Sequence, residues 1–250
     1  SLFRMYSMTK AITGVAVMML HEEQGWRLST PAKRWIPELG NLEVVEHDTD
    51  PGTGAPRHRL VPARRDITIR DLLTHPSGIS YGGPRDAQGK FYYQGIAGRG
   101  SGDFSIGDLA RGLGGVPLHN HPGDVWQYGL SQDVLAALVE VMSGQTYDVY
   151  LVERIFGPLG MTRTMVRPTP EHIVEERSVG YTPSGDGFLE IGDLGGAVGA
   201  GGIYSTVEDL QTWVENYASP RIGSAEIFEE MMTSYVLTDG EETGYGYGLS

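Results

Sequence analysis

Apolar residues recur at helical spacing in several stretches of the chain, and residues typical of helix termini flank them. The first stretch covers residues 11–23, and Gly25 supplies its stop. Four further helices are expected to begin at N-cap residues, namely Ser105, Ser131, Thr206 and Ser224. Together the pattern predicts helices over residues 11–23, 31–35, 105–113, 131–144, 146–156, 206–217 and 224–232. Residues 67–79 are expected to hold a further short, capped helix, which Pro76 and Gly78 end.

Three other stretches lack a helical pattern. Residues 40–65 are polar and rich in proline and glycine, which predicts an irregular excursion over the surface with His47 and His58 solvated. Residues 80–103 are rich in glycine and tyrosine, and they could line a pocket for an apolar acyl group or form a packed surface loop. The alternation in residues 245–250 indicates a strand that is just beginning.

Composition narrows the class of protein. With 250 residues and 40% hydrophobic content, the chain can bury a sizeable core as one large domain or two small ones. Its longest apolar run, residues 15–20, is far shorter than the roughly 20 residues of a membrane helix. The net charge of -13 argues against nucleic acid or an anionic membrane as partner, and the lack of cysteine excludes disulfides and thiolate chemistry. We expect a cytoplasmic location, with any signal peptide outside these residues.

Ser7 and Lys10 form the pair with the clearest chemical meaning. Residues three apart share one face of a helix, so the amine of Lys10 can reach the hydroxyl of Ser7. A serine hydroxyl needs an adjacent proton acceptor, and a lysine qualifies where burial or nearby positive charge lowers its pKa. The motif alone is weak evidence for catalysis. The chain has only three lysines against sixteen arginines, so arginine supplies most of its surface positive charge. A lysine on an apolar helix therefore indicates a specific role.

Other candidate motifs favour structural interpretations. His75 and Ser77 are nearly adjacent, and a catalytic pair is usually assembled from separate elements. His119 and His121 have a spacing seen in metal sites but lack a nearby third ligand, so we expect no metal. The glycine-rich run 195–202 lacks the lysine and the following helix of a phosphate loop, which argues against a nucleotide site.

Several blocks in order resemble the serine β-lactamase and penicillin-binding-protein superfamily, specifically its family VIII carboxylesterase branch. The resemblance covers nearly the whole chain, and it rests on residues 3–10, 67–79, 122–130, 146–164 and 201–209. It implies an α+β fold of the β-lactamase/DD-peptidase type, a helical region with an antiparallel sheet flanked by helices. We expect one domain over residues 1–250, helix-rich over about 66–165, with most of the sheet strands missing from this segment.

The resemblance also implies roles for individual residues. Ser7 would form the acyl-enzyme, Lys10 would share in taking its proton, and Tyr128 would relay protons to the leaving group. The backbone N–H of Ser7 would be half of an oxyanion hole. Substrate-binding positions would be Leu130, Gly201 and Gly202, and the mechanism implied needs no metal or cofactor.

The chain departs from the superfamily pattern at two places. Leu130 stands where lactam- and peptide-cleaving relatives usually carry an asparagine, which favours small-molecule esters with short or medium acyl chains. The third motif, Lys/His-x-Gly, is absent, as are the strands that normally precede the nucleophile helix. We therefore expect a segment of a longer protein, with about 50 or more residues on each side.

Two rival functions stay open from the sequence. One is a D-amino-acid peptidase or weak β-lactamase, and the other is a non-catalytic relative that keeps the fold as a binding or assembly module. Ser7, Lys10 and Tyr128 together argue against the second rival. The sequence does not fix the oligomeric state.

Overall fold

The fold is built around two buried helices, seen in a computed structural model that describes residues 1–81, 105–166, 176–191 and 198–250. Helix α1 (Thr9–Gln24) is buried on every side from Thr9 to Leu20, as expected for a helix at the centre of a core. Helix α4 (Ser131–Ser143) is buried over its first nine residues and packs against α1. Gly25 ends α1 in the left-handed conformation, which confirms the predicted stop.

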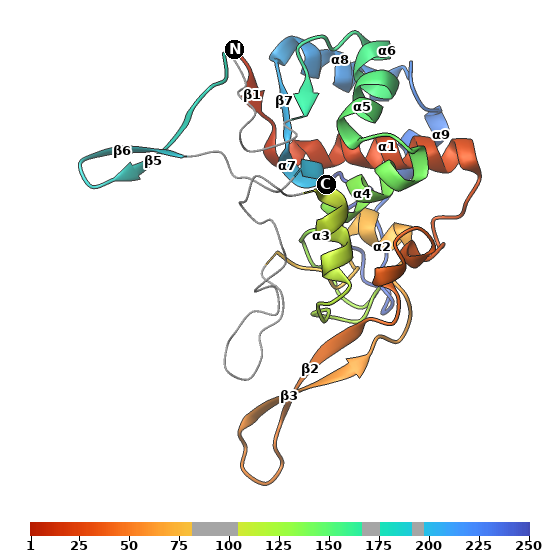
Figure 1. Cartoon of the computed structure of the whole chain (residues 1–250), viewed down its shortest axis with the longest axis vertical. Helices are drawn as coiled ribbons and strands as arrows, with labels where there is room; N and C mark the ends of the chain where they lie inside the picture. Colours follow the sequence, from red (N-terminus) through yellow and green to blue (C-terminus); the bar gives the residue numbers. More distant parts are fainter. Residues whose placement is uncertain (82–104, 167–175, 192–197) are drawn as a thin grey trace.

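Shorter helices surround this central pair (Figure 1). Helices α2, α3 and α5 pack against α4, whereas α9 packs against α1 and α7 packs against both. These and the remaining helical segments are α2 (Ile69–Thr74), α3 (Ile106–Leu113), α5 (Tyr147–Leu151), the π-helical η4 (Val152–Phe156), α6 (Gly157–Leu159), α7 (Val198–Gly201), α8 (Val207–Ala218) and α9 (Ala225–Met231). Short 3-10 turns are η1 (Tyr6–Met8), η2 (Ala32–Arg34) and η3 (Pro37–Leu39).

A small antiparallel sheet leads the chain into α1. Its strand order is β1 (Phe3–Arg4), β7 (Ile203–Ser205) and β4 (Met165–Val166), with Arg4 opposite Tyr204. The amide of Met5 donates to the carbonyl of Ile203 at 2.8 Å, immediately before the turn that carries Ser7. Helices with an antiparallel sheet confirm the α+β class predicted from the sequence.

Residues 40–65 contain a β-hairpin where the sequence predicted an irregular excursion. Strands β2 (Glu43–Thr49) and β3 (Pro56–Pro62) pair along their whole length, and the hairpin extends away from the helices (Figure 1). Ion pairs Asp48–Arg57 and Glu46–Arg59, at 2.7 Å each, cross between the strands. The prolines and glycines that suggested a loop lie at the strand ends and in the turn, where they do not interrupt the ladder.

Most predicted caps are confirmed, and one is wrong. The side chains of Ser105, Thr206 and Ser224 each accept the amide of the residue three positions later. Ser131 instead lies inside α4, and its hydroxyl hydrogen-bonds that of Ser77 at 2.8 Å. That partner comes from a distant segment, so the local sequence could not reveal it.

The predicted terminal strand is also wrong. Residues 245–250 turn back on themselves, because the amide of Gly246 donates to the carbonyl of Leu249 and that of Tyr247 donates to Met231. A side chain at Gly246 would lie 2.0 Å from the Met231 carbonyl oxygen, and Gly248 has a φ of 84°. The glycines therefore serve close packing and a turn, and the alternation with buried tyrosines does not mark a strand.

Two further sequence expectations on helices are corrected. Helix α5 begins near the predicted place, but the predicted single helix continues as the π-helical segment η4. The apolar spacing in residues 206–217 predicts that Val207, Trp213 and Val214 share the inner face of this helix. In α8 Trp213 is buried, but Val207 and Val214 are 69% and 65% exposed. Of the glycine- and tyrosine-rich stretch 80–103, residues 82–103 lie outside the described residues, and with them the question of a pocket-lining loop.

Candidate active site

Ser7 lies in the 3-10 turn η1, directly before α1 begins. The Nζ atom of Lys10, in the first turn of α1, donates to the Oγ atom of Ser7 at 3.2 Å. The three-residue spacing thus brings the two side chains together, although Ser7 itself precedes the α-helix. Tyr6, the residue before it, has a φ of 48°, a strained value for a side chain of this size that turns the chain sharply at the serine.

Lys10 is buried to an unusual degree for a lysine, with only 1% of its surface exposed. Its Nζ atom donates to two neutral oxygens, the hydroxyl of Ser7 and the carbonyl of Ala200, the latter at 2.9 Å. The same atom lies 4.6 Å from the centroid of the Tyr128 ring, in a cation–π arrangement. These contacts fix the amine beside Ser7 and leave little freedom for it to point elsewhere.

Tyr128 completes the group from a different part of the chain. Its hydroxyl donates to the Oγ atom of Ser7 at 2.9 Å, so two donors converge on one serine oxygen. The following residue, Gly129, allows close packing, because a side chain there would lie 2.2 Å from the carbonyl oxygen of Ile79. The amide of Gln127 donates to the carbonyl of His75 at 2.9 Å. These backbone contacts hold the loop of Tyr128 against the turn that follows α2.

Three aromatic rings lie close to the ring of Tyr128. The ring of His75 lies 4.7 Å from that of Tyr128, and the rings of Trp126 and Tyr81 lie 5.8 and 5.7 Å from it. Tyr245 contacts both His75 and Trp126, and burial raises the pKa of its phenol. Trp126 is 37% exposed, so this cluster offers an aromatic surface to a molecule bound near the serine.

The sequence missed the position of His75. Its side chain is fully buried against Tyr128, whereas the sequence indicates only a structural role beside Ser77. Nothing in its spacing reveals a contact with a tyrosine far along the chain.

Burial, and secondarily the nearby charge of Lys10, lower the pKa of His75 to about 3. In the unfolded chain the pKa is near the ordinary value of about 6.5, so below that pH the unfolded state binds a proton that the folded state does not. Stability from this residue is therefore complete above pH 6.5 and is lost as the pH falls toward 3. Burial raises the pKa of Tyr245, whose ring contacts that of His75, so this phenol does not change charge in this range.

A His75→Phe variant is expected to lack this dependence. From pH 7 to 4.5 the free energy of unfolding of the unaltered protein should fall by about 2 to 3 kcal/mol relative to the variant. Urea unfolding of both proteins at the two pH values measures the difference. A difference that stays constant with pH would show that His75 is not kept neutral by the fold.

The three predicted substrate-binding residues lie in different surroundings. Gly201 is adjacent to the turn η1 that carries Ser7, since a side chain there would lie 3.5 Å from the Cα atom of Tyr6. Gly202 packs inside the turn of α7, where a side chain would meet the carbonyl oxygen of Val198 at 2.8 Å. Leu130 belongs to the hydrophobic core and is 4% exposed, so its side chain offers a substrate almost no surface.

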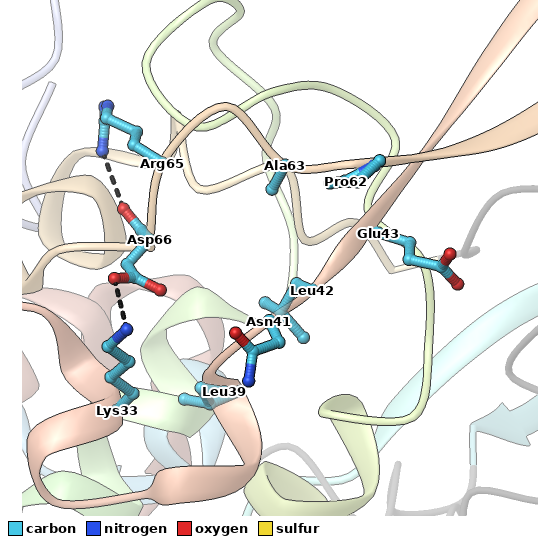
Figure 2. Close-up of a pocket in the computed structure, with 9 residues that line it drawn as sticks. All are labelled: Lys33, Leu39, Asn41, Leu42, Glu43, Pro62, Ala63, Arg65 and Asp66. Atoms are coloured by element: carbon cyan, nitrogen blue, oxygen red, sulfur yellow. Dashed lines mark hydrogen bonds and ion pairs between the residues drawn. The ribbon is translucent and has the colours of Figure 1, made fainter.

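A polar pocket of about 640 Å³ lies outside this group, near the start of β2 (Figure 2). Its two cationic side chains already have partners: Lys33 pairs with Asp66 at 2.7 Å, and Arg65 donates to the carbonyl of Asp66 at 3.1 Å. Arg65 also pairs with the buried carboxylate of Asp71. We assign no ligand to this pocket, because both of its cationic side chains are already paired with carboxylates.

The described residues contain no cluster of three or more histidine, cysteine, aspartate or glutamate side chains placed to hold a metal ion. His119 and His121 lie in the loop before Tyr128, and the ring of His121 contacts the Arg64 amide and the Glu46 carboxylate. Among the helices of the same residues, none is long and apolar enough to cross a membrane.

Comparison with known proteins places these observations in a family. The chain is 37% identical over 164 residues to Protein Rv1367c of Mycobacterium tuberculosis, covering 66% of this chain and 39% of that protein. It is 34% identical over 163 residues to Esterase EstB of Burkholderia gladioli, covering 64% and 37%. The chain thus spans about two fifths of the length of these relatives.

Solved structures give the same fold. EstCE1, described as a hydrolase with promiscuous acyltransferase activity, superposes with a TM-score of 0.76 at 22% identity, covering 99% of this chain and 68% of that one. At this identity the likeness concerns the fold alone. The model of the Beta-lactamase family matches residues 1–250, and the chain therefore belongs to the beta-lactamase family.

Proposed function

We propose that the protein is a serine hydrolase that cleaves carboxylic esters of short or medium acyl chains through an acyl-enzyme on Ser7. The observation that carries this proposal is the convergence of the Lys10 amine, at 3.2 Å, and the Tyr128 hydroxyl, at 2.9 Å, on the Ser7 oxygen. A nucleophile with a base and a second proton carrier in hydrogen-bond reach is the arrangement that acyl transfer requires.

The geometry suggests an order of proton transfers. Because both Lys10 and Tyr128 can donate to Ser7, one of them must first be without its proton to accept that of the serine. The Ser7 oxygen then attacks the ester carbonyl carbon, and the resulting oxyanion is stabilised by the backbone N–H of Ser7. The tetrahedral intermediate expels the alcohol, which takes the proton back from the Lys10–Tyr128 pair. Water repeats the cycle on the acyl-enzyme and releases the acid.

Two alternative functions fit these residues less well than ester hydrolysis. A D-amino-acid peptidase or weak β-lactamase would benefit from a side-chain amide at position 130, whereas the side chain of Leu130 is apolar and packs in the core. A non-catalytic binding or assembly relative would not need a buried lysine beside a serine, an arrangement with a desolvation cost for the folded state. Both considerations favour an ester hydrolase.

The substrate preference is open to direct measurement on the protein expressed from its complete reading frame. We expect p-nitrophenyl butyrate to be turned over roughly ten- to a hundredfold faster than a chromogenic cephalosporin, because the missing amide hydrogen bond is worth about 1–3 kcal/mol. A Ser7→Ala variant measured in parallel gives the background of spontaneous hydrolysis. Equal or faster turnover of the cephalosporin would overturn the assignment to esters.

A further inference from the structure

His75 is buried although the fold gains no hydrogen bond from its side chain. The ring is 0% exposed, and neither Nδ1 nor Nε2 has a hydrogen-bond partner among the residues that the structure describes. Burying polar atoms without partners destabilises a folded protein, so an apolar side chain would be the better choice for packing alone. The position therefore calls for an explanation beyond core packing.

His75 contacts the loop of Tyr128 through both its ring and its backbone. Its ring lies 4.7 Å from Tyr128 at an interplanar angle of 33°. Its backbone carbonyl accepts the amide of Gln127, the residue just before Tyr128, at 2.9 Å. The residue thus holds the tyrosine both through its ring and through its main chain.

The backbone of His75 limits what else could stand there. His75 is the C-cap of α2 and has a φ of 72°, in the left-handed region that bulky side chains adopt only with strain and that histidine and asparagine tolerate better. Among the residues that tolerate this φ, histidine is the one with a flat ring. Its neutral state, kept by burial beside Lys10, avoids a second cation next to the amine.

We infer that His75 is a positioning residue, whose ring supports Tyr128 so that the phenol hydroxyl stays on the Ser7 oxygen. Tyr128 is itself only half-buried, and Lys10 contacts its ring at 4.6 Å. Without the histidine ring, the tyrosine gains room to turn, and the 2.9 Å contact with Ser7 is lost for part of the time. The kinetic consequence rests on the proposed function, whereas the packing consequence does not.

Three variants separate ring packing from other effects. His75→Phe keeps a flat ring and removes the nitrogens. His75→Asn removes the ring and keeps a residue that tolerates the left-handed φ. His121→Asn is the control, because it alters another buried histidine outside the site. With p-nitrophenyl butyrate, His75→Asn should lower kcat about tenfold or more with KM within about twofold, since small misplacements of a catalytic group cost rate. His75→Phe should recover at least about a third of kcat, and His121→Asn should keep it unchanged.

Rates are taken per nucleophile titrated with an aryl phosphonate, so incomplete folding of a variant does not count as lost catalysis. Unchanged kcat in His75→Asn would overturn the inference while leaving the proposed function intact. An equal loss in His75→Phe would overturn it as well, because the nitrogens and not the ring would then matter.

A second measurement does not depend on any activity. In a thermal unfolding cycle of His75→Asn, Tyr128→Leu and the double variant, the Tm loss of the double variant should be smaller than the sum of the single losses, because the two residues share one contact. The same cycle with His121→Asn should be additive. Additive losses for His75 and Tyr128 would refute the support of one ring by the other. If the unaltered protein hydrolyses no ester, the proposed function fails and this cycle still decides the packing claim.

Discussion

A Lys10→Arg variant is expected to lose acylation of Ser7 by about a thousandfold or more. The guanidinium of arginine stays protonated at every pH of interest and cannot take the serine proton. Lys10 is 1% exposed, and its amine is held between Ser7 and the carbonyl of Ala200. The rate of covalent reaction with an aryl phosphonate, followed by intact mass, measures the loss.

Two control variants show whether the loss is specific to the amine of Lys10. Lys10→Met keeps a long apolar stem without any amine, and it should lose acylation equally while removing the demand for a buried charge. Lys33→Arg alters an exposed lysine, with 44% of its side chain accessible, and should react at the normal rate. Normal labelling of Lys10→Arg would remove the lysine from the mechanism.

Tyr128→Phe should lower kcat for p-nitrophenyl butyrate by about a hundredfold or more, the usual contribution of one general acid or base. The phenylalanine ring keeps the contacts with His75 and with the Lys10 amine, which do not involve the hydroxyl. The fold should therefore persist, and the loss should fall on the transfer of protons to and from the Ser7 oxygen.

The matched control is Tyr217→Phe. The hydroxyl of Tyr217 is buried and lacks a hydrogen-bond partner within the described residues, so its removal tests the same chemical change away from Ser7. The kcat of the Tyr217→Phe variant should stay within about threefold of that of the unaltered protein. A Tyr128→Phe variant as active as this control would exclude the phenol as a proton carrier.

Local features of the fold could be predicted from the sequence, because the interactions that make them are local. A capping serine or threonine bonds an amide three residues away, as at Ser105, Thr206 and Ser224, and a glycine stop such as Gly25 needs only its own backbone freedom. The Ser7–Lys10 contact belongs to the same class, since three residues span it.

Features that depend on distant partners could not be predicted in this way. The local sequence predicts Ser131 as a cap, whereas its hydroxyl hydrogen-bonds that of the distant Ser77. The prolines and glycines at the ends of β2 and β3 indicate a loop, although the two strands pair as a hairpin. The contact of Tyr128 with Ser7 was expected only from the family resemblance. The support of Tyr128 by His75 was not expected at all, because it needs the turn after α2 and the loop before α4 to meet.

Peptide mapping of a covalent adduct identifies the nucleophile, which we propose to be Ser7. The protein expressed from its complete reading frame is treated with an aryl phosphonate, digested and analysed by tandem mass spectrometry. We expect a single adduct on Ser7, because Ser77 and Ser131 are both fully buried and their hydroxyls are hydrogen-bonded to each other. An adduct on Ser77 or Ser131, with Ser7 unmodified, would contradict it.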